Sequence, residues 1–191
     1  MSEIIKQLKP TFEKGIEPVV DFLHKKNISP NTLTIVGIGF ITIGSYFIFF
    51  DLLIIAGIFI TIGNLCDMLD GALARKYNMQ TKFGAFLDSV IDRYSDFLPL
   101  MAAAYLFRDN FYMFLFSMFA IAGSFLVSYT RARAEGLGID CKVGIFERPE
   151  RSILLIVSLF LGLLEVAVVL IALGSHYTAL QRVLCFYNKT K

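Results

Sequence analysis

Four aspartates within 26 residues give this chain its clearest potential for chemistry: Asp67, Asp70, Asp88 and Asp92. The first two are three positions apart and the last two are four apart, so on helices each pair would share one face. Two such faces turned toward each other would gather like charges, which repel unless cations lie between them. Carboxylate oxygens favour Mg²⁺ or Mn²⁺, ions that commonly serve phosphoryl chemistry. The spacing therefore predicts a site for one or two divalent cations.

The composition places these aspartates in a membrane protein. Of the 191 residues 56% are hydrophobic, and the mean hydropathy is +0.65. Long apolar runs are typical of membrane spans. Six apolar segments can be distinguished, at 32–50, 52–73, 84–107, 111–134, 150–164 and 165–186. We therefore predict an all-α integral membrane fold with six transmembrane helices. Residues 1–191 would form a single domain, with the six-helix bundle at 32–186.

The segment before the first span has a different pattern. Residues 2–26 mix charged residues with apolar ones at roughly helical spacing, which predicts an amphipathic helix lying on the membrane surface. The alternative is an ordinary helix packed against the body of the protein. Ser29 and Pro30 are typical of a helix start and mark the entry into the first span.

The distribution of positive charge predicts the orientation. In the six-helix arrangement 16 of the 18 lysines and arginines lie on one side of the membrane. Arg93 falls inside a span, and Arg108 lies in a loop on the opposite side. The positive-inside rule then places both termini and the aspartates on the cytoplasmic face of the cytoplasmic membrane. A net charge of only +2 gives no indication of nucleic-acid binding.

The cysteines and histidines suggest no site. Cys66, Cys141 and Cys185 have neither metal-ligand spacing nor the pattern of a disulfide framework, so we expect them to be free thiols. The two histidines, His24 and His176, lie far apart in the sequence, and nothing supports them as ligands.

Charged residues inside membrane helices are costly and usually functional, and three alternatives to a metal-dependent phosphoryl-transfer site remain. In the first, the aspartates form internal ion pairs, such as Asp92 or Asp96 with Arg93, although one internal cation does not balance them. In the second, they line a cation pathway in a carrier, which would spread acidic residues through the membrane depth. The third is a membrane prenyltransferase, because Asn64-x-x-Asp67 weakly resembles one of the Asp-rich motifs of those enzymes. Prenyltransferase chains, however, are usually longer.

The motif around the aspartates resembles the signature of the CDP-alcohol phosphotransferase family, D-x-x-D-G-x-x-A-R-x8-G-x3-D-x3-D. The sequence matches every fixed position of that pattern, namely Asp67, Asp70, Gly71, Ala74, Arg75, Gly84, Asp88 and Asp92. The chain length and the six predicted helices also agree with the family, so the resemblance covers essentially the whole chain. Members transfer a phosphatidyl-type group from a CDP-linked lipid or alcohol to a hydroxyl acceptor and release CMP.

The resemblance implies a role for each matched residue. Asp67, Asp70, Asp88 and Asp92 would hold two divalent cations, Mg²⁺ or Mn²⁺, and Asp92 would also be the general base for the acceptor hydroxyl. The donor site would include six residues, namely Asn31, Thr34, Gly71, Ala74, Arg75 and Thr81. Metal and Arg75 would neutralise the donor pyrophosphate and the CMP leaving group. No Ser-His or Cys-His arrangement offers a covalent route, so direct in-line displacement is the simplest mechanism.

The loop at 131–151 bears on the acceptor. Its strings Arg131-Ala-Arg133-Ala-Glu135 and Glu147-Arg148-Pro149-Glu150-Arg151 resemble the phosphatidylinositol phosphate synthase branch. There Arg131, Arg148 and Arg151 would bind the phosphate of inositol 1-phosphate, which arginine can grip with two hydrogen bonds. The simpler interpretation is an ordinary positive-inside loop, and glycerol 3-phosphate is the main competing acceptor. The lipid could be diacylglycerol or archaeol.

The resemblance also implies a homodimer, for which the Phe-rich faces of the third and fourth spans are candidate contacts. Asp96 continues the face of Asp88 and Asp92 by one more turn but lies outside the family's metal set, and we assign it no role.

Overall fold

The computed structural model describes residues 15–191, and within them every regular element is a helix. The elements are a helical segment at 15–25 and six longer helices: α2 (Pro30–Ile48), α3 (Leu53–Lys76), α4 (Lys82–Leu106), α5 (Phe111–Gly136), α6 (Arg148–Leu161) and α7 (Leu164–Thr190). Each predicted apolar segment corresponds to one of these helices. The all-helical prediction is therefore confirmed.

Local sequence explains where several helices begin. The Ser29 hydroxyl caps α2 by accepting a hydrogen bond from the Thr32 amide at 3.2 Å, and Pro30 occupies the first turn, as predicted. Thr81 and Asn110 cap α4 and α5 in the same way. Short polar side chains between apolar runs therefore set the entry points of these helices.

Four of the helices, α2, α3, α5 and α7, are long and apolar enough to cross a membrane. α4 is long enough at 25 residues but carries Asp88, Asp92, Arg93 and Asp96, and α6 has only 14 residues. The protein is thus a multi-helix membrane protein with four candidate spans among residues 15–191.

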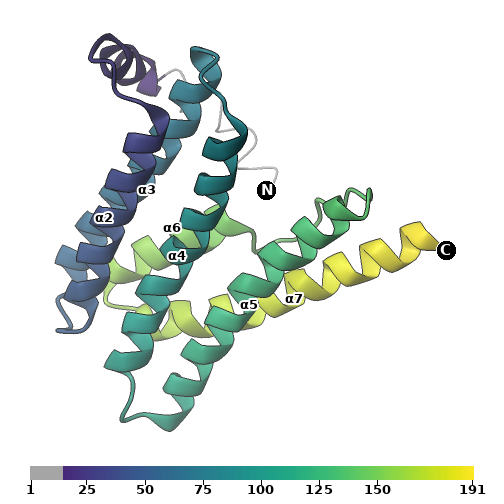
Figure 1. Cartoon of the computed structure of the whole chain (residues 1–191). Helices are drawn as coiled ribbons and strands as arrows, with labels where there is room; N and C mark the ends of the chain where they lie inside the picture. Colours follow the sequence, from purple (N-terminus) through teal and green to yellow (C-terminus); the bar gives the residue numbers. More distant parts are fainter. Residues whose placement is uncertain (1–14) are drawn as a thin grey trace.

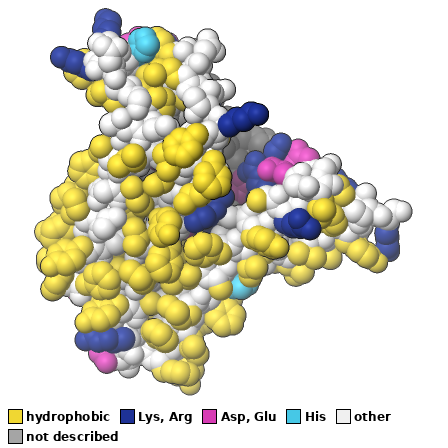
Figure 2. All heavy atoms as spheres, in the orientation of Figure 1, with side chains coloured by type: hydrophobic (Ala, Val, Ile, Leu, Met, Phe, Trp, Pro, Cys, Tyr) yellow, Lys and Arg dark blue, Asp and Glu magenta, His cyan; other side chains and the backbone are white. Residues whose placement is uncertain are grey.

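The helices form two pairs joined by α4. α2 packs along α3, α5 packs along α7, and α4 contacts both α2 and α5 (Figure 1). α6 lies against α3 and α7. Figure 2 shows hydrophobic side chains over most of the lower part of this face, whereas basic side chains are found at its upper end, in the hollow between the two pairs, along the arm at the right and at the lower edge. The middle of this face is therefore mainly apolar, and charged side chains lie toward its edges and in the hollow.

Close packing of α2 on α3 depends on glycine. A Cβ atom at Gly37 would lie 3.0 Å from the carbonyl oxygen of Gly63, and one at Gly44 would lie 3.0 Å from that of Ala56. Small residues let helix backbones approach in a membrane, where no hydrophobic driving force holds helices together. The pair positions the start of α2 beside the end of α3, where several of the predicted site residues lie.

The helical segment at 15–25 packs on the body of the protein. Val20 is buried with Leu33 and Leu73, and Lys76 bonds Asp21 at 2.5 Å. Hydrogen bonds from Lys76 and Tyr77 hold the pKa of Asp21 below its usual value. This agrees with the packed-helix alternative, although Val19 and Phe22 remain exposed. Residues 2–14 of the predicted amphipathic helix lie outside the described residues.

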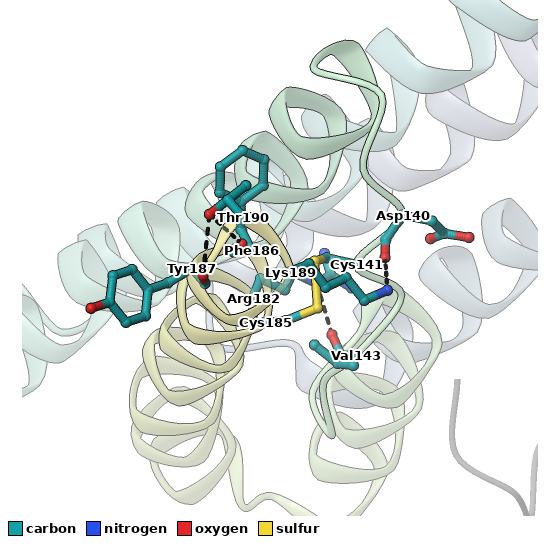
Figure 3. Close-up of a disulfide and its surroundings, with 9 residues drawn as sticks. All are labelled: Asp140, Cys141, Val143, Arg182, Cys185, Phe186, Tyr187, Lys189 and Thr190. Atoms are coloured by element: carbon teal, nitrogen blue, oxygen red, sulfur yellow. Dashed lines mark hydrogen bonds between the residues drawn. A yellow bond between two sulfur atoms is a disulfide. The ribbon is translucent and has the colours of Figure 1, made fainter.

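The loop between α5 and α6 is fastened to the end of α7 (Figure 3). A disulfide joins Cys141 of the loop to Cys185 of α7, with their Cα atoms 6.0 Å apart. Lys189 donates to the carbonyl oxygen of Asp140 at 2.6 Å, and Arg182 donates to that of Val143 at 2.8 Å.

The expectation of three free thiols is therefore wrong for Cys141 and Cys185 and correct for Cys66. The two partners are 44 positions apart, so only the packing of α5 on α7 brings them together. That contact could not be read from cysteine spacing.

We expect the disulfide to stabilise the fold by about 2–4 kcal/mol, because it closes a long loop in the unfolded chain. Replacing both partners (Cys141→Ser with Cys185→Ser), or adding a reductant, should lower the thermal unfolding midpoint in detergent. Cys66→Ser is the control and should behave like the unaltered protein. Equal midpoints with and without reductant would contradict a stabilising disulfide.

Candidate active site

Three of the four predicted metal ligands come together in the structure. Asp67 and Asp70 lie in the last three turns of α3, and Asp88 lies in the second turn of α4. One carboxylate oxygen from each can be chosen so that all three lie within 4.8 Å of one another. α2 packs against both α3 and α4, which make few contacts with each other. The carboxylates therefore face one another across the space between two helices.

This donor set fits a divalent cation. Asp70 is buried at 5% exposure, and the three carboxylates would repel one another strongly in such surroundings. Only oxygen ligands are present in the group, which suits Mg²⁺ or Mn²⁺ better than a softer metal. The prediction of a carboxylate cluster is thus matched by geometry for Asp67, Asp70 and Asp88.

Asp92 is outside this group and faces an arginine. Its Oδ1 lies 2.7 Å from Nη1 of Arg148, and its Oδ2 lies 3.5 Å from Nη1 of Arg93. Arg148 also donates from Nη1 and Nη2 to the two carboxylate oxygens of Asp67, at 2.9 and 3.2 Å. The structure therefore brings Arg148, predicted for the acceptor site, into direct contact with two predicted metal ligands.

Asp96 forms a second, deeper ion pair. Its Oδ2 accepts a hydrogen bond from Nη2 of Arg151 at 2.5 Å, and Nη1 of Arg151 donates to the carbonyl oxygen of Phe146 at 3.0 Å. Arg151 is only 3% exposed. Arg93 was expected to be the one cation within the spans, but Arg148 and Arg151 also face the aspartates. Their spacing of three residues, at the start of an amphipathic segment, was the available signal.

The predicted donor residues surround one cavity of about 280 Å³ beside the carboxylates. All six of them line it: Asn31, Thr34, Gly71, Ala74, Arg75 and Thr81. Asp70 and Asp88 line it as well, and the Thr34 hydroxyl donates to Asp70 at 2.5 Å. Residues from the start of α2, the end of α3 and the start of α4 thus converge on a single space.

Glycine keeps this cavity open. A Cβ atom at Gly84 would lie 3.0 Å from both the amide oxygen of Asn31 and the hydroxyl oxygen of Thr81, and one at Gly71 would lie 3.0 Å from the Arg75 guanidinium. Both glycines belong to the motif. Their positions provide a spatial reason for a residue without a side chain at the cavity wall.

Arg182 was missed by the sequence argument, and Arg131 lies apart from the carboxylates. Arg182 is 3% exposed and donates to Glu147 at 3.0 Å and to the carbonyl oxygens of Val143 and Val127. It therefore ties α7 to α5 and to the residue that precedes α6. Arg131 pairs with Glu135 along the exposed face of α5 at 3.0 Å. No sequence signal distinguished Arg182 from a basic residue near the C-terminal tail.

Comparison with known proteins agrees with this geometry. Residues 27–180 match the family model for CDP-alcohol phosphatidyltransferase. An archaetidylinositol phosphate synthase of Pyrococcus horikoshii is 35% identical over 94% of this chain and 95% of its own. A phosphatidylinositol phosphate synthase of Streptomyces avermitilis is 32% identical over 93% of this chain and 80% of its own. An uncharacterised protein of Aquifex aeolicus is 46% identical over 96% of this chain and 94% of its own.

Solved structures show the same fold. The phosphatidylinositol phosphate synthase of Mycobacterium tuberculosis with CDP-DAG bound matches with a TM-score of 0.82 and 27% identity, covering 89% of this chain and 92% of that one. The same enzyme in complex with manganese and citrate matches with a TM-score of 0.81 and 28% identity, covering 89% and 88%. These matches favour neither a carrier nor a prenyltransferase. From motif, geometry and relatives together, this chain belongs to the CDP-alcohol phosphatidyltransferase family of enzymes.

Proposed function

We propose that the enzyme transfers a phosphatidyl-type group from a CDP-linked lipid to a hydroxyl of inositol 1-phosphate, producing phosphatidylinositol phosphate or its archaeol counterpart, and CMP. The main support is that the aspartates lie between two different surroundings. Asp70 and Asp88 line the cavity of the predicted donor residues, whereas Asp67 and Asp92 contact Arg148 on the other side. Donor and acceptor would thus meet at the carboxylates.

On the donor side, Arg75 and the polar groups of Asn31, Thr34 and Thr81 would bind the cytidine diphosphate. Gly71 and Ala74 leave room for it, because bulkier side chains would enter the cavity. The lipid tails would stay in the bilayer beside the apolar helices. The M. tuberculosis relative with CDP-DAG bound supports a lipid donor of this class.

Two divalent cations, Mg²⁺ or Mn²⁺, would be held by Asp67, Asp70, Asp88 and Asp92. When bound, they would neutralise the donor pyrophosphate and the departing CMP. Asp92 would accept the proton of the acceptor hydroxyl, whose oxygen bonds to the lipid-bearing phosphorus as the bond to CMP breaks. The contact with Arg148, before an acceptor binds, would place Asp92 close to the acceptor site.

On the acceptor side, Arg148 would bind the phosphate group. Arg151, buried and paired with Asp96, and Arg131, paired with Glu135 on α5, remain predicted contributors to this site. An anionic acceptor suits this charge better than serine or choline would. The inositol phosphate synthases among the relatives favour inositol 1-phosphate over glycerol 3-phosphate.

The six helices α2–α7 would all cross the cytoplasmic membrane, with termini and active site in the cytoplasm. α6, at 14 residues, is only about 21 Å long, so it would need tilt or local thinning of the bilayer. The clustering of basic residues at the active-site end supports this orientation. The disulfide between Cys141 and Cys185 lies at the same end as the active site. Because disulfides are uncommon in the cytosol outside hyperthermophiles, its presence is an argument for the opposite orientation, and the orientation needs a direct measurement.

The orientation can be measured by labelling single introduced cysteines in intact cells, in a protein whose own cysteines are replaced by serine. We expect Asp109→Cys, in the loop between α4 and α5, to react with an impermeant reagent, and Gln80→Cys, beside α4, to be protected. The opposite pattern would place the active site outside.

A homodimer through the exposed aromatic faces of α4 and α5 would bury side chains such as Phe86, Tyr94 and Phe119. Light scattering of the detergent-solubilised protein would reveal it, and a monomeric mass would exclude it.

CMP release by the purified enzyme in detergent tests the reaction. With CDP-diacylglycerol or CDP-archaeol and Mg²⁺ or Mn²⁺, we expect release with inositol 1-phosphate and none after chelation by EDTA. Parallel reactions with glycerol 3-phosphate, inositol and serine identify the acceptor. Release with glycerol 3-phosphate alone would show that inositol 1-phosphate is not the acceptor, and the proposed transfer from a CDP-linked lipid would still stand.

Asp92→Asn should lower the rate of transfer by about 10²- to 10⁴-fold, because the amide cannot take a proton from the acceptor. CDP-lipid binding, measured by displacement of a labelled donor, should partly survive. Asp109→Asn changes an exposed carboxylate in the loop between α4 and α5 and is the matched control. An Asp92→Asn enzyme with full activity would remove Asp92 as the base.

Gly84→Ala should raise the KM for the CDP-lipid by about tenfold, equivalent to ~1.4 kcal/mol of binding. The added methyl group would lie 3.0 Å from two cavity side chains. Gly39→Ala is the control, since a Cβ there meets nothing within 4 Å. If both variants kept the normal KM, the cavity would not be the donor site.

A further inference from the structure

One arginine is shared between two of the carboxylates in the active site. Nη1 of Arg148 lies 2.9 Å from Oδ2 of Asp67 and 2.7 Å from Oδ1 of Asp92. The cluster of three carboxylates within 4.8 Å includes Asp67 but not Asp92. The Arg148 guanidinium therefore lies where a second metal ion, shared by Asp67 and Asp92, would bind, and it supplies the positive charge there.

The bonds of this arginine are unequal. With Asp67 it makes two hydrogen bonds, from Nη1 and Nη2. Oδ1 of Asp92, although close, has no well-aligned hydrogen bond among the described residues, and neither does Nε of Arg148. Buried polar atoms without partners are costly, so a ligand that satisfied Nε would bind favourably. A phosphate offers suitable oxygens and pairs well with a guanidinium.

The backbone that carries Arg148 is held firmly while its side chain is within reach of solvent. The residues on either side are anchored: Glu147 bonds Arg182, and Arg151 bonds Asp96, both pairs being largely buried. The Arg148 side chain is 21% exposed. Its long side chain could thus reorient from the carboxylates toward an incoming anion without movement of α6.

We infer that the Arg148 side chain exchanges its contacts with Asp67 and Asp92 for contacts with the acceptor phosphate. This exchange couples acceptor binding to divalent-cation binding. A guanidinium and a cation compete for the same oxygens of Asp67 and Asp92. An acceptor phosphate that draws the guanidinium away leaves those carboxylates free for the metal. Linkage requires the effect to be reciprocal, so the metal also strengthens acceptor binding. The inference rests on the proposed metal and acceptor sites.

Binding of Mn²⁺ to the full-length protein in detergent, followed by electron paramagnetic resonance of free Mn²⁺, tests this without turnover, because no CDP-lipid is added. Inositol 1-phosphate at a concentration that saturates the enzyme should tighten Mn²⁺ binding by about fivefold or more, after correction with a protein-free titration. Arg148→Gln should bind Mn²⁺ more tightly without acceptor and should respond little to it.

Two further variants separate this role from a general structural effect. Arg148→Lys keeps a charge and should retain part of the coupling. Arg133→Gln removes an exposed arginine from the last turn of α5 and should behave like the unaltered protein. Thermal unfolding of each variant establishes that it is folded.

The outcomes separate the inference from the proposed function. Coupling that persists in Arg148→Gln would mean that the acceptor phosphate binds the metal directly, and it would overturn the role of Arg148. If the Mn²⁺ affinity of the unaltered protein were the same with and without inositol 1-phosphate, the coupling would be overturned, whereas the metal site would be confirmed. If no Mn²⁺ bound at all, the metal site and the inference would fall together.

Discussion

The accumulation of negative charge at the ends of apolar helices is the constraint on which the rest of the structure depends. Asp67, Asp70 and Asp88 meet between α3 and α4, and Asp92 and Asp96 extend the charge along α4. In a medium of low dielectric constant such a group is stable only with matching positive charge. Arg148 and Arg151 of α6 supply part of it, and the remainder suits divalent cations.

This requirement explains several features that otherwise look unrelated. α6 is short and begins at the level of the aspartates, so its first two turns carry the arginines inward. The loop before it is fastened to α7 by the disulfide and by Lys189 and Arg182, which limits the freedom of the α6 start. Glycines bring α2 against α3, and the start of α2 then completes the cavity that we propose for the donor. Helix packing and active-site chemistry are therefore parts of one arrangement.

Much of this was accessible from sequence because the relevant signals are local. Apolar runs predicted the helices, Ser29 and Pro30 predicted the start of α2, and spacing within α3 and α4 predicted the clustered aspartates. The partners of those aspartates were not accessible, since Arg148 contacts Asp67 across 81 positions. The disulfide and the burial of Arg182 likewise depend on how α5 packs on α7. Such contacts are set by tertiary packing, which no local pattern encodes.

We expect Asp67, Asp70 and Asp88 to bind a divalent cation beside the proposed donor cavity. Anomalous X-ray scattering at the manganese edge, on crystals grown with Mn²⁺ and a CDP-linked lipid, tests it most directly. We predict a strong peak between these three carboxylates, with the pyrophosphate of the lipid next to it and near Arg75. A manganese peak elsewhere, or a donor bound away from the aspartates, would show that these carboxylates are not the metal site.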